Sequence, residues 1–422
     1  MKVKSLTLRS FRGIDDLTLD FDPNVTVLIG NNGAGKSSIL DALAISFTQF
    51  VEKVSEVGME ISQKFQYSDI INSFTQSTLQ MSVDCLGEQT WIATRDRFTD
   101  ESTFSAAEGS IPPEEVASSF VRNLLNNHRA NLPLIVYYPV SRGVTSISLE
   151  SSLNFLEEQA RSAQTLAYDH SLPAGRSSFS DFFQWFKIRE DLENEVRLEK
   201  DSSYRDHQLK AVRDAIYSFL PGFSNLRVRR SPLRMIVEKF GELVVNQLSD
   251  GEKGLLAMVG DLARRLAIAN PGLADPLQGE GIVLIDEIEL HLHPEWQRRI
   301  IPSLTQTFPN CQFIITTHSP QILGEIQDGI VYRLSPSPQG IIAEKMQTYG
   351  RDSNQILEDV MDVSERSPTF KNNLRRLFRL IEDGNLDEAK RLQQELENLI
   401  QYDEPEFAKS EALIRRKEVL GR

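Results

Sequence analysis

Apolar and polar positions alternate along the first part of the chain and then give way to an unbroken apolar run. Residues 3–29 contain VKSLTLRSF and LTLDF, which alternate as half-buried strands do, and VTVLIG, which predicts a buried strand. The glycine-rich stretch GNNGAGKSS follows, and ILDALAISF then repeats its apolar residues at helical spacing. This part of the chain therefore predicts strands, a glycine loop and a helix in that order.

The pattern is less regular from about residue 48 to residue 226. LQMSVDCL and QTWIATRD predict two strands that turn at Gly87, and LPLIVYYPVSR predicts a buried strand. Two helical patterns follow, DFFQWFKIREDLENEVRLEK and LKAVRDAIYSFLPGF, and the second ends at Pro221 and Gly222. We therefore expect an inserted, largely helical lobe at residues 111–225.

The second half of the chain returns to regular strands and helices. RMIVEKFGELVVNQL predicts a hairpin that turns at Phe240 and Gly241, and a long helical pattern runs from SDGEK to a proline. GIVLIDE and CQFIITTHSP predict buried strands around the helix PEWQRRIIPSLTQTFP. This order predicts an α/β fold, a mixed sheet with flanking helices. The expected head comprises residues 1–110 and 226–365, and residues 366–422 are an expected helical tail that contacts a partner or another copy.

The amino-acid composition indicates the class of protein and the cellular compartment to expect. The 422 residues are 40% hydrophobic and 25% charged, as in an ordinary soluble globular protein. No apolar run approaches the roughly 20 residues needed to span a bilayer, and the first residues lack the apolar core of a signal peptide. We therefore expect a cytoplasmic protein without a membrane partner. Cys85 and Cys311 are too few for a disulfide framework or a structural zinc site.

The net charge argues against a dedicated nucleic-acid binder. The formal charge is −14, whereas such proteins usually have a basic excess or a basic stripe. One local basic stretch, RVRRSPLR, contains Arg227, Arg229, Arg230 and Arg234. A solvated strand face explains this stretch at least as well as a DNA contact does. Residues 371–422 contain eleven basic and eleven acidic residues, so the tail is not a basic arm.

The glycine loop has the spacing of a phosphate-binding loop. Gly30, Gly35, Lys36 and Ser37 fit G-x-x-x-x-G-K-[ST], between a predicted strand and a predicted helix. Such a loop cradles phosphate oxygens with backbone amides, while the lysine reaches the β- and γ-phosphates and the serine hydroxyl ligates Mg²⁺. We therefore predict binding of ATP or GTP with Mg²⁺. The expected nucleotide-binding residues are Asn31, Asn32, Gly33, Ala34, Gly35, Lys36, Ser37 and Ser38.

The segment QLSDGEK indicates which class of nucleotide hydrolase this is. Ser249 and Gly251 open a predicted helix after a hairpin, which resembles the ABC-type signature usually written LSGGQ. A helix start of this kind presents amides, a hydroxyl group and the positive end of its dipole to an anion. The resemblance implies that the anion is the γ-phosphate bound by a second subunit. An ordinary N-cap serine is the alternative.

Carboxylates and histidines follow the buried strand in VLIDEIELHLHPEW. In an ATP site, Asp286 would bind Mg²⁺ and Glu287 would activate water as the general base. His318 ends the next predicted strand, in the position of the switch histidine that contacts the γ-phosphate. The competing interpretation is a metal nuclease site made of Glu289, His291 and His293.

Five stretches together resemble the RecF/SMC/OLD branch of ABC-type ATPases: SFRGIDDLTLDF, VLIGNNGAGKSSILDAL, LSDGEK, GIVLIDEIELHLHPEW and FIITTHSPQIL. The resemblance covers residues 1–45 and 225–350, and it implies an ABC-type P-loop head that binds ATP and dimerises head to tail. It also places Arg12 near the nucleotide and His293 at the D-loop aspartate position, facing the second subunit. The Q-loop ligand stays open among Gln63, Gln66, Asp69 and Gln76.

A narrower resemblance comes from LSDGEKGLLAMVGDLARRLAIANP, DFFQWFKIREDLENEV, YGRDSNQILEDVM and the helical tail. These stretches are similar to the Septu-type ATPases of bacterial antiphage systems, which lack a TOPRIM nuclease domain. The resemblance implies a separate HNH nuclease partner and nucleic-acid contact either directly or through that partner. A RecF-like, ATP-dependent DNA-binding repair protein is the alternative, and a transporter ATPase fits less well.

Overall fold

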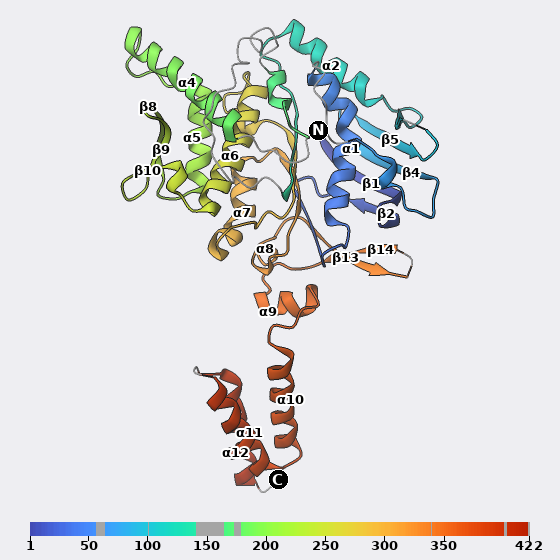
Figure 1. Ribbon diagram of the computed structural model, residues 1–422, viewed down its shortest axis with the longest axis vertical. Helices are drawn as coiled ribbons and strands as arrows, with labels where there is room; N and C mark the ends of the chain where they lie inside the picture. Colours follow the sequence, from blue (N-terminus) through green and yellow to red (C-terminus); the bar gives the residue numbers. More distant parts are fainter. Residues whose placement is uncertain are drawn as a thin grey trace. The chain divides into compact units, whose positions relative to one another are not determined.

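The computed structural model describes residues 1–55, 64–99, 101–140, 164–172, 179–338, 340–400 and 403–420 (Figure 1). The chain divides into two compact units, Met1–Ile356 and Leu357–Arg422. Gln63, one of the Q-loop candidates, lies outside the described residues. Among those residues, we find no helix with both the length and the apolar character needed to cross a membrane.

A six-stranded sheet forms the centre of the first unit, in the order β14-β13-β3-β12-β11-β7. Its strands are β3 (Val25–Gly30), β7 (Leu134–Tyr138), β11 (Gly281–Ile285), β12 (Cys311–Thr316), β13 (Ile330–Ser337) and β14 (Gly340–Met346). All neighbouring pairs are parallel except β13 and β14. β7, β11 and β12 are buried at every position, as expected of parallel strands covered on both faces.

A second, antiparallel sheet has the order β2-β1-β4-β5-β6. Its strands are β1 (Lys2–Phe11), β2 (Ile14–Asp20), β4 (Gln76–Asp84), β5 (Glu88–Asp96) and β6 (Thr103–Ala106). Helix α1 (Lys36–Ser55) lies between the two sheets, because it contacts β3, β7 and β12 of one and β4 and β5 of the other. Phe47 and Phe50 of α1 pack against Trp91 of β5, and all three side chains are fully buried.

Helix α6 (Asp250–Ala269) lies on the other side of the central sheet from α1 (Figure 1). It contacts β7, α4 (Phe179–Glu199) and α5 (His207–Phe219). A three-stranded antiparallel sheet in the order β10-β9-β8 has one edge strand against α4. Its strands are β8 (Ser224–Arg230), β9 (Leu233–Glu238) and β10 (Glu242–Val244).

The remaining helices of the first unit are α2 (Pro113–Asn126), α7 (Pro294–Thr307), α8 (Pro320–Leu323) and α9 (Ser353–Gln355). Short 3-10 turns are η1 (Tyr67–Asp69), η3 (Thr165–Tyr168), η4 (Val245–Gln247) and η5 (Pro276–Gln278), and η6 (Ile356–Val360) is a π-helical turn.

Among the described residues of the second unit, three α-helices surround a small core of their own. They are α10 (Pro368–Glu382), α11 (Leu386–Leu399) and α12 (Pro405–Leu420). The core residues are Leu374, Leu377, Ile381, Ala389, Leu396, Phe407 and Ile414.

The predicted fold class, a mixed sheet with flanking helices and a helical C-terminal region, is confirmed. The stretch LPLIVYYPVSR falls inside the expected lobe at residues 111–225, yet its strand β7 pairs with β11 as an edge of the central sheet. Residues 111–225, expected as an inserted lobe, therefore contribute a buried strand to the central sheet. The domain boundaries themselves stay a prediction.

Candidate nucleotide site

Three neighbouring parallel strands place the predicted site segments next to one another at the carboxyl ends of the strands of the central sheet. β3 pairs with β12, and β12 pairs with β11, with Leu28 opposite Thr316 and Ile315 opposite Ile285. The segments that leave these strands therefore start side by side. They are the phosphate loop after β3, Asp286 and Glu287 after β11, and His318 after β12.

The backbone of the loop depends on glycine. Gly30 has a φ of +148°, and a Cβ there would lie 2.5 Å from the backbone oxygen of Leu334. Gly33 has a φ of +82° and faces open space, so the loop is accessible at its middle. Asn31, Asn32 and Ser37 are exposed, whereas Ala34 is buried. Because α1 begins at Lys36, its free first-turn amides lie beside this accessible loop, an arrangement that fits a polyphosphate.

The Lys36 side chain is buried and folded back onto the loop. Its Nζ donates to the backbone oxygens of Gly30 at 2.9 Å and Asn31 at 3.2 Å. Burial lowers the pKa of Lys36, while Asp286, Glu287 and Glu289 oppose that shift. The site therefore combines a buried cation, which can pair with phosphate oxygens, and nearby carboxylates, which can hold a metal ion.

Thr316 holds both carboxylate residues at the end of β11. Its Oγ1 donates to Asp286 Oδ1 at 2.5 Å and accepts from the backbone amide of Glu287 at 2.7 Å. Glu287 has a φ of +46°, a left-handed conformation that costs a non-glycine residue about 1–3 kcal/mol and is common at functional sites. Thr316 was not predicted as a site residue, although its place as the last residue of the buried strand β12, two residues before His318, was a usable signal.

Glu289 hydrogen-bonds to the loop that contains His318. Its carboxylate accepts from Thr317 Oγ1 at 2.7 Å and from the backbone amide of His318 at 2.5 Å. His291 and His293 are exposed, and His293 Nδ1 accepts weakly from the amide of Glu295, at 3.4 Å, as the N-cap of α7. Across the described residues, no three His, Cys, Asp or Glu side chains are placed to hold a metal. These contacts leave the metal nuclease interpretation of this segment without support.

The signature segment caps α6 with its own side chains. The Ser249 amide and Oγ donate to Glu252 Oε2 at 2.9 and 2.8 Å, and Lys239 Nζ donates to the other Glu252 oxygen. A Cβ on Gly251 would lie 2.4 Å from the backbone oxygen of His291. The start of α6 therefore packs directly on the loop that follows the two carboxylates, and only glycine permits that approach.

Arg12 lies in the turn between β1 and β2 with a φ of +50°. Its Nη1 donates to Asp41 Oδ2 at 2.5 Å, and its Nε donates to Asp69 Oδ1 at 2.9 Å. Burial alone would lower the pKa of Arg12, but Asp41 and Asp69 outweigh it and raise the pKa. Arg12 thus joins the phosphate-loop helix to the segment that contains the Q-loop candidates. Gln66 and Gln76 are exposed, and the choice of ligand stays a prediction.

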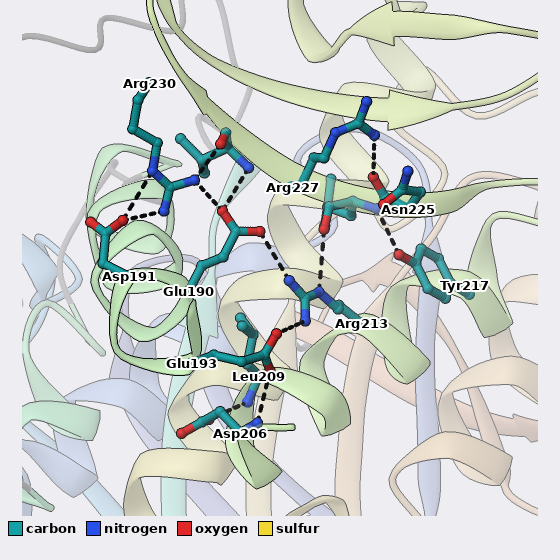
Figure 2. Close-up of polar contacts among 12 residues, drawn as sticks. Glu190, Asp191, Glu193, Asp206, Leu209, Arg213, Tyr217, Asn225, Arg227 and Arg230 are labelled. Atoms are coloured by element: carbon teal, nitrogen blue, oxygen red, sulfur yellow. Dashed lines mark hydrogen bonds and ion pairs between the residues drawn. The ribbon is translucent and has the colours of Figure 1, made fainter. Parts of the chain in front are cut away.

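Three arginines of the basic stretch, Arg227, Arg229 and Arg230, lie on β8 and pair with acidic side chains. Figure 2 shows the pairs of Arg230. Arg227 pairs with Glu238 and Glu242, and Arg229 pairs with Glu242. Arg230 pairs with Glu190 and Asp191 of α4, and Glu190 also accepts from Arg213 at 3.0 Å. These ion pairs offset most of the positive charge that a DNA contact needs.

Residues 2–341, a range that includes every candidate site residue, match the family described as the RecF/RecN/SMC N terminal domain. This chain belongs to the RecF/RecN/SMC family. It is therefore an ABC-type ATPase, which agrees with the names of its relatives.

Three curated relatives are similar over most of their length. The chain is 34% identical to Retron Ec83 probable ATPase of Escherichia coli, over 88% of this chain and 78% of the relative. It is 33% identical to Retron Vc95 probable ATPase of Vibrio cholerae serotype O1 biovar El Tor, over 76% of this chain and 71% of the relative. It is 24% identical to Septu protein PtuA of Bacillus thuringiensis, over 91% of this chain and 90% of the relative. The predicted resemblance to Septu-type ATPases is confirmed, and the similarity to retron ATPases was not predicted.

Solved SMC head structures share the fold of this RecF/RecN/SMC ATPase. A SmcHead bound to the C-winged helix domain of ScpA has a TM-score of 0.51 and 15% identity, covering 82% of this chain and 98% of that one. An Smc head with an extended coiled coil, bound to a ScpA domain derived from Pyrococcus furiosus, has a TM-score of 0.51 and 14% identity, covering 82% and 96%. At such identity the likeness concerns the fold alone, and the predicted ABC-type head is confirmed.

Proposed function

We propose that two copies of this ATPase pair head to tail around ATP and Mg²⁺, and that this pairing regulates an HNH nuclease partner in bacterial antiphage defence. The observation that carries the proposal is the meeting of the phosphate loop, two carboxylates and His318 at one sheet edge. The relatives named as Septu and retron proteins support the defence setting. The helical tail at residues 366–422 is the proposed contact for the partner or another copy.

Each composite site would take Lys36, Ser37, Asp286 and Glu287 from one chain and Ser249 from the other. Lys36 and the loop amides bind the phosphates, and Glu287 accepts the proton of the attacking water. Ser37 and Asp286 would hold Mg²⁺, which would supply positive charge against the phosphate oxygens. His318 would contact the γ-phosphate from a loop that Glu289 holds through two hydrogen bonds. The products are ADP and phosphate.

Glu287→Gln tests this proposal, because the amide cannot accept the proton yet keeps the shape of the side chain. ATP hydrolysis should fall at least about 100-fold, in the range of general-base contributions. ATP should then convert the variant into a stable dimer, measured by light scattering with and without Mg²⁺. Glu114→Gln, at an exposed position of α2, is the control and should hydrolyse ATP normally. Hydrolysis by Glu287→Gln at the normal rate would contradict the general-base role.

A RecF-like DNA-binding function predicts ATP-dependent duplex binding that weakens steeply with salt. The ion pairs of Arg227, Arg229 and Arg230 count against it. A duplex titration across salt concentrations separates the two functions.

A further inference from the structure

The end of strand β7 contacts three separate parts of the candidate site. The backbone oxygen of Tyr138 accepts from the amide of Asp286 at 2.9 Å. The Tyr138 hydroxyl donates to Asp261 Oδ2 on α6 at 2.9 Å. Burial and the nearby Asp41 carboxylate of α1 raise the pKa of the Tyr137 hydroxyl, and Asp41 in turn pairs with Arg12. Two consecutive residues therefore join the Mg²⁺ carboxylate, the signature helix and the phosphate-loop helix.

The alternation of a β-strand explains how neighbouring tyrosines reach different helices. Successive side chains on a strand point to opposite faces of the sheet. α1 and α6 cover opposite sides of the central sheet, and both contact β7 (Figure 1). Tyr137 therefore reaches α1 while Tyr138 reaches α6, and both side chains are buried.

Asp261 is a fixed anchor for Tyr138. Arg265 Nε donates to Asp261 Oδ2 and Arg264 Nη2 donates to Asp261 Oδ1, both at 2.7 Å. Arg265 Nη1 also donates to the backbone oxygens of Ala167 and Asp169 at 2.7 and 2.8 Å. All three charged side chains are buried, and separating one of them from its partners would leave an uncompensated buried charge, so the Asp261 carboxylate is held in place.

The anchor lies on the helix that begins with the signature serine. α6 runs without interruption from Asp250 to Ala269, so Asp261 lies about 18 Å along it from Ser249 at 1.5 Å per residue. The signature helix is therefore hydrogen-bonded to Tyr138 through Asp261. The backbone oxygen of Tyr138 in turn accepts from the amide of Asp286, so a continuous series of contacts joins the start of α6 to the carboxylates.

We propose that Tyr137 and Tyr138 are positioning residues that couple the nucleotide occupancy of one site to hydrolysis at the other. This inference rests on the proposed head-to-tail dimer, in which α6 binds the nucleotide of the second chain. Tyr138 transmits the position of α6 to Asp286 and Glu287 of its own chain. Tyr137 links the end of β7 to Asp41 and Arg12, so its position depends on whether the phosphate loop of its own chain holds a nucleotide.

Tyr138→Phe in the full chain tests the coupling, because it removes only the hydroxyl and keeps the ring. We expect kcat to fall about ten-fold, the effect of losing about one hydrogen bond to a charged group. The Hill coefficient for ATP should fall towards one, while ATP binding in the Glu287→Gln background changes less than about two-fold. Tyr137→Phe should instead raise KM with a smaller change in kcat.

Tyr332→Phe is the matched control. Tyr332 is also buried on a central strand, and its hydroxyl donates to the Asp20 backbone oxygen at 3.1 Å. It should keep the normal kcat and Hill coefficient. Equal kinetics for Tyr138→Phe and Tyr332→Phe would overturn the coupling role. It would also be overturned if both variants lost turnover and melting temperature to the same extent, because the loss of turnover would then follow from lower stability.

The dimer on which the inference rests is tested separately. If Glu287→Gln does not dimerise with ATP, the proposed function fails, whatever the tyrosine variants do. If it dimerises and Tyr138→Phe behaves like the control, only the coupling inference fails.

Discussion

Gly251 illustrates how a single residue sets the geometry of the candidate site. Its missing side chain lets the start of α6 approach the backbone oxygen of His291, where a Cβ would lie 2.4 Å away. In sequence terms this glycine looks like part of a signature that faces a phosphate. In the structure it also joins the signature to the loop behind Glu287, so the two motifs share one rigid contact.

Gly251→Ala should therefore impair hydrolysis more than folding. The added methyl group displaces either the α6 start or the His291 loop, and we expect kcat to fall by at least about ten-fold. Gly254→Ala, three residues along α6, meets nothing within 4 Å and should stabilise the helix by up to about 1 kcal/mol. ATPase assays and urea unfolding of both variants measure the difference. Equal activity in the two variants would show that the His291 contact is dispensable.

At the scale of elements, the charged network around α4, α5 and β8 is structural. Glu190 and Glu193 of α4 are buried, and Arg213 of α5 bridges them at 3.0 and 3.1 Å (Figure 2). Glu190 also accepts from the backbone amide of Val228 at 2.9 Å and from Arg230. The basic stretch is therefore one side of an interface between a strand and a helix.

Arg230→Met should destabilise the fold, because it leaves the buried Glu190 with fewer donors. We expect the free energy of unfolding to fall by about 1–3 kcal/mol. Arg229→Met removes a pair with Glu242 that is largely exposed, and it should cost less than about 1 kcal/mol. Urea unfolding at matched ionic strength provides the comparison. A greater loss for Arg229→Met than for Arg230→Met would refute this account of the network.

At the scale of the whole molecule, the chain carries an ATPase head and a separate helical unit with its own hydrophobic core. Because each core is built from its own residues, each unit can keep its packing when the other is removed. That independence would suit the proposed role of the tail as a partner contact.

A chain ending at residue 365 should therefore retain ATP hydrolysis and the melting temperature of the head within about 2 °C, equivalent to about 1.5 kcal/mol for a unit of this size. It should lose binding to a co-expressed HNH nuclease, measured by affinity co-purification beside the full chain. Undiminished nuclease binding by the shortened chain would place the partner contact on the head.

Much of the fold followed from local pattern. Unbroken apolar runs predicted β3, β7, β11 and β12, and helical spacing predicted α1, α4, α5, α6 and α7. β6, β13 and β14 were not predicted, because their short or half-exposed patterns do not stand out from loops.

The sequence by itself determined the order of motifs and the family, because glycine, lysine and carboxylate spacing along one chain is local chemistry. Only the tertiary structure decided that Thr316 holds Asp286, that Glu289 holds the His318 loop and that Tyr138 joins α6 to β11. These contacts link residues from different strands and helices, so they depend on strand register and helix packing, which no local pattern encodes.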